Sequence, residues 1–132
     1  MYLLDINICI FALNGRRPKL TEKLLTIHPK DICISSVTVS ELEYGAAKSK
    51  WGEKTKSNML MFLANYDIIP FTEADAVICG DIRGQLAIAG TPIGVYDIMI
   101  AAQGLSRNYT VITNNTREFE RVPNLNIEDW TV

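Results

Sequence analysis

Short apolar segments alternate with longer segments of mixed character along the whole chain. The short segments are the length of buried strands, whereas the longer ones repeat apolar residues every three or four positions, as amphipathic helices do. An edge strand is also expected in the tail, between Asn126 and Trp130. The other predicted strands are Tyr2–Leu4, Ile32–Ile34, Tyr66–Phe71 and Thr110–Thr113.

Helices are predicted between these strands. Thr38 precedes Glu41 by three positions, the spacing of a capping box, and so predicts a helix that continues to about Lys48. Strands separated by helices predict an α/β fold, an α/β/α sandwich with a mostly parallel central sheet. The other predicted helices are Asn7–Leu13, a segment around Leu20–Leu25, Met59–Leu63, Glu73–Ala89 and Asp97–Leu105.

Composition narrows the class of protein. Residues 1–132 carry no repeat, linker or low-complexity segment, and 48% hydrophobic with 21% charged residues is typical of one globular domain. A net charge of -2 argues against nucleic-acid binding by overall charge, although a bound cation can reverse the sign of a site. Three scattered cysteines and one histidine favour free thiols over a zinc centre. No signal peptide or membrane-length apolar run is visible, so we expect a cytoplasmic protein.

Three acids are candidates for chemistry. Asp5 follows the first strand, Asp97 opens an apolar helix after the glycine-rich loop 90–94, and Glu41 lies near the start of another helix. Each also has a purely structural interpretation as a helix-capping residue. Ligands of open α/β sheets bind beyond the carboxyl ends of the strands, where Asp5 and Asn115 would meet. Clustered carboxylates stay ionised most readily around a hard cation such as Mg²⁺ or Mn²⁺, which suits phosphate chemistry.

Four segments together resemble one known family. They contain Leu3-Leu4-Asp5-Ile6-Asn7, Ile34 to Leu42 with Glu41, Gly90 to Asp97, and Val111-Ile112-Thr113-Asn114-Asn115 followed by Arg117-Glu118-Phe119. In this order and spacing they are similar to PIN-domain nucleases, and among these to the VapC toxins of bacterial toxin–antitoxin pairs. The resemblance covers essentially the whole chain.

The resemblance implies a Mg²⁺-dependent endoribonuclease, with Mn²⁺ able to substitute. Carried over by position, Asp5, Glu41 and Asp97 would be catalytic, and Asp5 and Asp97 would bind the metal. It further implies a VapB-like antitoxin and a homodimer. Among VapC toxins the chain looks most similar to those that cut the anticodon loop of initiator tRNA.

Two positions depart from the family pattern. Asn115 stands where the family has a fourth acid, and Ile6 stands where it commonly has a hydroxyl residue. We therefore expect one ion to be held well and a second poorly, with Glu118 as a partial substitute for the missing acid. Asn7 and Thr113 are expected to support the site, although they could equally serve as a helix cap and a turn residue. The same departures motivate an alternative, a catalytically weakened module that binds RNA or antitoxin. A third alternative, a structure-specific DNA nuclease, ranks last because the chain lacks the arched insertions that such enzymes use.

Basic residues form two local groups. Lys48, Lys50, Lys54 and Lys56 surround Trp51, and Arg16, Arg17 and Lys19 form a smaller group. Lysines can hold phosphates and an aromatic ring can stack on an unpaired base, so Lys48, Lys50, Trp51 and Lys54 are candidate RNA contacts. A solvated helix end or a dimer rim would have the same composition.

Overall fold

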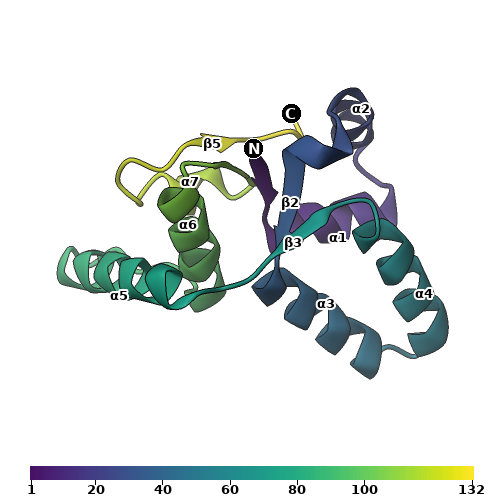
Figure 1. The fold of residues 1–132 in the computed structure, drawn as a ribbon, viewed down its shortest axis with the longest axis horizontal. Coiled ribbons are helices and arrows are strands. Elements are labelled where there is room, and N and C mark those ends of the chain that lie inside the picture. The colour runs from purple at the N-terminus through teal and green to yellow at the C-terminus, as the bar shows by residue number, and fades with distance from the viewer.

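A five-stranded sheet forms the centre of the computed structural model, which describes residues 1–132 (Figure 1). Its order is β3-β2-β1-β4-β5, and every neighbouring pair is parallel. The predicted α/β fold with a mostly parallel sheet is therefore confirmed, and the sheet is parallel throughout. The strands are β1 (Tyr2–Leu4), β2 (Ile32–Ser35), β3 (Asp67–Ile69), β4 (Thr110–Ile112) and β5 (Ile127–Glu128).

Seven α-helices and one 3₁₀ helix connect the strands. They lie on both sides of the sheet, with α5, α6 and α7 on one side and α1 to α4 on the other (Figure 1). No helix is long and apolar enough to cross a membrane. The helices are α1 (Ile6–Asn14), α2 (Pro18–Thr26), η1 (Pro29–Asp31), α3 (Ser36–Lys48), α4 (Gly52–Leu63), α5 (Glu73–Ile88), α6 (Val95–Arg107) and α7 (Thr116–Phe119).

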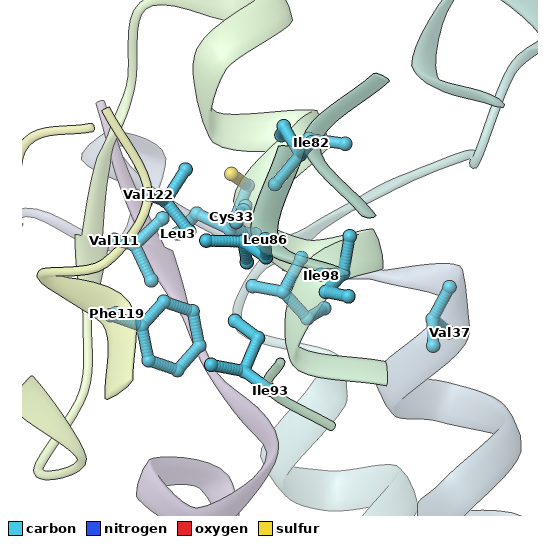
Figure 2. Close-up of a cluster of buried hydrophobic side chains, with 13 residues drawn as sticks. Leu3, Cys33, Val37, Ile82, Leu86, Ile93, Ile98, Val111, Phe119 and Val122 are labelled. Atoms are coloured by element: carbon cyan, nitrogen blue, oxygen red, sulfur yellow. The ribbon is translucent and has the colours of Figure 1, made fainter. Parts of the chain in front are cut away.

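Each face of the sheet has its own hydrophobic core because successive strand residues point to opposite faces. Leu3 of β1 lies in one core with Ile98 of α6 and Phe119 of α7 (Figure 2). The next residue, Leu4, lies in the other core with Ile8 of α1 and side chains from α2 and α4. The sequence therefore produces the predicted α/β/α sandwich by simple alternation in three-residue strands.

The strand order places a topological switch point at the middle of the sheet. From β1 the chain moves outward to β2 and β3, then returns to form β4 on the other side of β1. Leu4 pairs with Ile112 at the ends of β1 and β4, and the Asp5 N–H donates to the Ile112 carbonyl at 3.0 Å. The polar residues that follow these two strands are therefore neighbours, at the place where open α/β sheets bind ligands.

Two predicted helix caps are wrong. Ser35, not Thr38, caps α3: its Oγ accepts the Val37 N–H at 3.0 Å, so the helix begins before Thr38. Thr38 is instead buried within the first turn, and its hydroxyl has no partner. At α1 the cap is Asp5, which excludes the helix-cap alternative for Asn7. The chain does contain a capping box, but at Thr72 and Asp75 of α5.

Candidate active site

Asp5 is the buried centre of the site. Its side chain is 2% exposed, and Oδ1 accepts the Ile8 N–H at 2.9 Å, so the carboxylate both caps α1 and stays fixed at the end of β1. Burial raises its pKa to about 6, and hydrogen bonds from the Thr113 hydroxyl and the Ile8 N–H reduce this rise. The negative charges of Asp97 and Asp129 add to it. Asp5 is thus a carboxylate in surroundings that lack positive charge.

Thr113 connects the ends of β1 and β4. It is completely buried, and its Oγ1 accepts the Asn115 N–H at 2.9 Å, which leaves the hydroxyl proton for the Asp5 carboxylate. One side chain therefore orients both Asp5 and the backbone at Asn115. A supporting role for Thr113 in the chemistry stays a prediction.

Asp97 faces the site from the first turn of α6. Its carboxylate is half-buried, and the pKa is raised by burial and by the negative charge of Glu118, with no hydrogen bond to counter the rise. Asp97 lines an open hollow together with Ile6, Asn7 and Tyr96. Asn7 is therefore at the site, although as an exposed wall residue. The helix begins at Val95, so Asp97 stands in its first turn and not at its first residue.

Glu118 approaches the same site from α7. Asn115 Nδ2 donates to Glu118 Oε2 at 2.9 Å, and Glu118 in turn raises the pKa of Asp97, as Asp97 raises that of Asp5. Three carboxylates from three separate segments thus act electrostatically on one another. The fold thus brings acids from separate parts of the sequence to the carboxyl edge of the sheet.

Glu41 occupies a different setting. It is half-buried on α3 and lines a hollow between α1, α3 and α4, together with Ile10, Asn14 and Asn58. Asp5 and Asp97 do not line this hollow. No three His, Cys, Asp or Glu side chains form a ready-made metal cluster in the chain. A catalytic role for Glu41 stays a prediction.

Asp129 is a nearby acid that the sequence reasoning missed. It follows β5 directly, and its charge raises the pKa of Asp5. Its Oδ1 accepts two hydrogen bonds from Thr131, which fix it in a turn. The rule that polar residues gather after parallel strands would have found it, had the two-residue strand β5 been placed with certainty.

The donor atoms of the site suit a hard divalent cation. Asp5 and Asp97 both present carboxylate oxygens at raised pKa, and the nearby Asn115 and Thr113 offer only further oxygen or nitrogen. Mg²⁺ and Mn²⁺ prefer oxygen ligands, and a cation would remove the repulsion that raises these pKa values. The chemistry of these residues therefore fits such an ion, and the assignment of Asp5 and Asp97 as its ligands stays a prediction.

Comparison with known proteins decides the family. A model of the PIN domain matches residues 2–125. The chain belongs to the PIN domain family. It is 42% identical over 130 residues to the tRNA(fMet)-specific endonuclease VapC of Shigella flexneri, a match that covers 98% of each chain. It is 38% identical over 131 residues to Ribonuclease VapC2 of Rickettsia felis, again with 98% of each covered.

Solved structures of other PIN domains agree with this assignment. A chain in the crystal structure of DNA-bound VapBC from Salmonella typhimurium superposes with a TM-score of 0.92 at 40% identity, covering 98% of this chain and 97% of that one. A chain of VapBC2 from Rickettsia felis, bound to a promoter DNA fragment, gives 0.91 at 36% identity, covering 98% of each. The identified resemblance to VapC proteins is therefore confirmed.

The predicted RNA-contacting residues of this PIN domain lie at the α3–α4 turn. Lys48, Lys50, Trp51 and Lys54 are all exposed there. The turn is at the far end of α3 from the sheet (Figure 1). The structure thus places these residues at the end of α3, in the turn and at the start of α4, and their contact with RNA stays a prediction.

Proposed function

We propose that this protein is a metal-dependent endoribonuclease toxin of a VapBC-type pair. The observation that carries the proposal is the placement of two acids at the switch point of the sheet. Asp5 is buried directly after the central strand β1, and Asp97 lines one hollow with Ile6 and Asn7, the two residues that follow Asp5. Relatives that span nearly the whole chain are named as ribonucleases, which supports hydrolysis of RNA phosphodiester bonds.

The chain's own residues have distinct parts in this proposal. Asp5, fixed by the Ile8 N–H and Thr113, and Asp97 would hold Mg²⁺ or Mn²⁺. When bound, such an ion lowers the pKa of a water molecule and neutralises charge that develops on the phosphate. Glu41 is assigned to orient the attacking water or to bind the metal.

Glu118 and Asn7 complete the arrangement. Glu118, which Asn115 holds, keeps negative charge beside Asp97 in the place of the missing fourth acid. Asn7 lines the hollow beside Asp97, where its amide can contact the RNA backbone. Both positions support a site in which one cation is bound firmly.

The proposed substrate is initiator tRNA, cut in its anticodon loop. The support is similarity: the Shigella flexneri relative is named tRNA(fMet)-specific. Purified protein with Mg²⁺ should cleave initiator tRNA in preference to elongator methionine tRNA, and sequencing of the RNA ends should locate one cut. Equal cleavage of both tRNAs would overturn this substrate while leaving a general ribonuclease.

The catalytic proposal is tested with Asp5→Asn and Asp97→Asn. Both changes keep side-chain size and remove charge, so RNA cleavage and growth inhibition should fall at least a hundredfold. Asp67→Asn is a matched control. Asp67 is exposed at the start of the edge strand β3, whereas Asp5 follows the end of the central strand β1. Full activity in either site variant would refute the proposed active site.

The proposed partner is a VapB-like antitoxin, and the proposed free state is a homodimer. Several structural relatives are VapBC complexes, which supports such a pair for this chain. Co-expression with the product of an adjacent small reading frame should restore growth and yield a stable complex. Light scattering of the purified toxin should give twice the mass of the 14.8 kDa chain.

A second candidate function is an RNA- or antitoxin-binding module with weakened catalysis. The observation in its favour is that no three acids form a ready-made metal cluster, together with Asn115 and Ile6 at the departing positions. Calorimetry with Mn²⁺ separates the two functions. A nuclease should bind Mn²⁺ in a manner that Asp5→Asn abolishes, whereas a module without catalysis should bind none.

A further inference from the structure

Two aromatic rings near the junction of α3 and α4 are exposed to solvent, Tyr44 within α3 and Trp51 at the N-cap of α4, and each has a lysine near it. Tyr44 is 59% exposed and Trp51 is 69% exposed. Lys48 Nζ lies 4.6 Å from the centre of the Tyr44 ring, and Lys50 Nζ lies 5.9 Å from that of Trp51. Both distances are within the range of a cation–π interaction, so a positive charge stands beside each open ring.

The turn is also a basic region on an acidic protein. Residues 43–56 contain four lysines and two glutamates, although the whole chain has a net charge of -2. Lys56 forms an ion pair with Glu43, while Lys48, Lys50 and Lys54 make no salt bridge. Three lysine charges therefore remain available to a negatively charged ligand.

Local contacts hold the backbone at Trp51 in place. Ser49 Oγ accepts the Trp51 N–H at 3.1 Å and lies 3.2 Å from Thr55 Oγ1. A Cβ at Gly52 would come within 3.2 Å of the Ala46 carbonyl oxygen, so glycine allows the chain to turn closely there. These contacts hold the backbone from which the Trp51 side chain projects, so little backbone entropy is lost when the ring contacts a ligand.

We propose that this turn binds unpaired nucleotides of the RNA substrate, away from the bond that is cut. Tyr44 and Trp51 stack on bases, and Lys48, Lys50 and Lys54 contact phosphates. The inference rests on the proposed function, and it adds a binding surface to it. Lys48 lies seven residues beyond Glu41 on α3, about 10 Å along the helix, and Trp51 lies beyond the end of that helix, whereas Tyr44 is one turn from Glu41 and is the part of the surface nearest the site. The surface therefore acts on affinity and leaves the chemistry to Asp5, Asp97 and Glu41.

RNA accounts for this surface better than a protein partner does. Lysine is depleted in protein–protein interfaces, whereas a basic surface with open aromatic rings is typical of sites for single-stranded nucleic acid. Stacking tolerates any base, so the surface would strengthen binding without selecting sequence. Selection of the cleaved bond is left to the acidic site.

The test measures binding of a fluorescent anticodon stem-loop RNA in EDTA, where metal-dependent cleavage cannot occur. Trp51→Leu keeps an apolar side chain but cannot stack, and it should raise Kd roughly 5- to 100-fold, whereas Trp51→Phe should stay close to wild type. Lys48→Gln and Lys50→Gln should each reduce the slope of log Kd against log salt by about 0.7 to 1. Lys30→Gln, exposed on η1, is the control and should leave the slope unchanged.

Two results would overturn the inference. One is a Trp51→Leu variant that binds the stem-loop as tightly as wild type. The other is a Trp51→Leu variant that loses capture of the antitoxin while keeping RNA affinity, which would make the turn a protein-binding surface. If wild-type protein binds the stem-loop but cuts no RNA, the proposed function fails while the binding measurement still decides the role of the turn.

Discussion

Asn115 donates a 2.9 Å hydrogen bond to Glu118, and this bond joins the amide at the predicted fourth acid position to the nearest carboxylate of α7. The amide cannot replace the charge of a carboxylate, but it holds Glu118 where that charge raises the pKa of Asp97. Under the proposed function, Glu118 would thus supply part of the charge of the missing acid from one helical turn further along the chain.

Glu118→Gln tests this compensation. Removal of the charge should lower the pKa of Asp97 in the metal-free protein, since the repulsion from Glu118 is lost. It should also weaken Mn²⁺ binding by about tenfold, the typical cost of losing a group that supports a metal site. NMR titration and calorimetry measure the two effects. Glu120→Gln, exposed just after α7, should change neither.

Asp5 should make stability depend on pH in the opposite sense to an ordinary surface acid. Its pKa is about 6 in the folded protein and near 3.8 when unfolded, so the folded state retains its proton longer as pH rises. Ionisation of buried Asp5 therefore lowers the free energy of unfolding. This loss of stability is absent below about pH 4, grows between pH 4 and 6, and is complete above pH 6, where it reaches as much as about 3 kcal/mol.

Asp5→Asn should therefore stabilise the metal-free protein while abolishing activity. Asparagine can still accept the Ile8 N–H, so the cap of α1 is retained. Urea unfolding in EDTA should show a gain at pH 7.5 that shrinks toward zero at pH 4. Mn²⁺ should reverse the order, because it binds the wild-type carboxylate. An equal gain at both pH values would contradict the raised pKa of Asp5.

The fold was predictable from the sequence because its decisive signals are local. The central strands β1, β2 and β4 are short apolar runs followed or ended by a polar residue, and Leu4-Asp5 marks the end of β1 on its own. The position at which α3 begins is not determined by local sequence alone. Thr38 and Glu41 have the spacing of a capping box, yet β2 continues to Ser35, which pairs with Ile69 of the distant strand β3. Tertiary pairing therefore decides which hydroxyl caps the helix.

The site was predictable only in part, for the same reason. Asp5 was predictable because it follows a strand, and Asp97 because it opens a helix after a glycine-rich loop. The electrostatic effect of Glu118 on Asp97 depends on how α7 packs against the sheet, which no short sequence pattern specifies. The hollow that Glu41 lines is formed by three helices, so the surroundings of Glu41 could not be predicted from spacing along the sequence.

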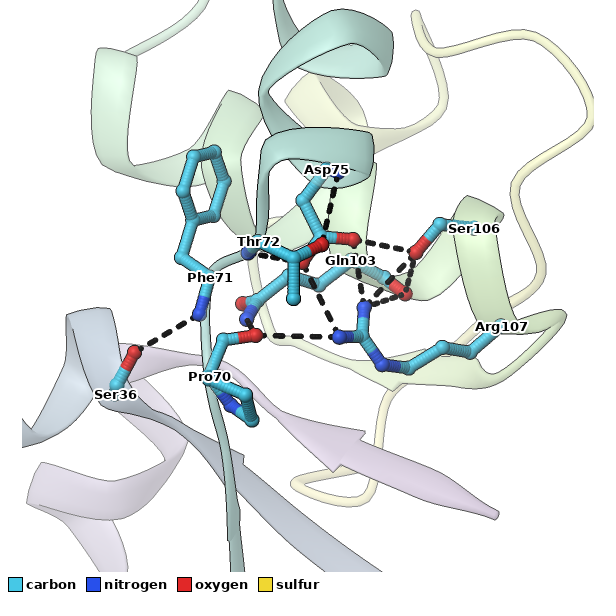
Figure 3. A network of polar contacts seen from close by, with 8 residues as sticks. All are labelled: Ser36, Pro70, Phe71, Thr72, Asp75, Gln103, Ser106 and Arg107. Atoms are coloured by element: carbon cyan, nitrogen blue, oxygen red, sulfur yellow. Dashed lines mark hydrogen bonds and ion pairs between the residues drawn. The ribbon is translucent and has the colours of Figure 1, made fainter.

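Arg107 is expected to be essential for stability. Burial alone would raise the pKa of Asp75, but hydrogen bonds from Arg107, Ser106 and Thr72 outweigh it and lower the pKa to about 2. Arg107 Nη1 lies 2.7 Å from Asp75 Oδ1, and Nη2 donates to the Pro70 carbonyl at 3.2 Å (Figure 3). One side chain thus joins the end of α6 to the start of α5.

Arg107→Leu should cost about 3 kcal/mol at pH 7, because it leaves a buried carboxylate without its cation. The wild-type contribution is complete above about pH 4 and is lost as pH falls toward 2, so the difference between the two proteins should shrink in that interval. Thermal unfolding at several pH values checks this. Arg83→Leu is the control, as an exposed residue of α5 that makes no salt bridge. A pH-independent difference would show that lost packing, and not the ion pair, accounts for the cost.

Two glycines in helices should respond to alanine in opposite directions. At Gly104 of α6, an added Cβ would lie 2.8 Å from Val111 Cγ2 and 3.3 Å from Leu125 Cδ1, so the helix would have to move away from β4. Gly104→Ala should therefore destabilise by roughly 1–3 kcal/mol. At Gly84 of α5 nothing lies within 4 Å, and Gly84→Ala should stabilise by up to about 1 kcal/mol through helix propensity. Denaturant unfolding of both variants measures the pair. Because α6 also carries Asp97, Gly104→Ala should reduce RNA cleavage as well, whereas Gly84→Ala should leave cleavage unchanged. Stabilisation of the protein by both variants would refute the close packing of α6 against β4.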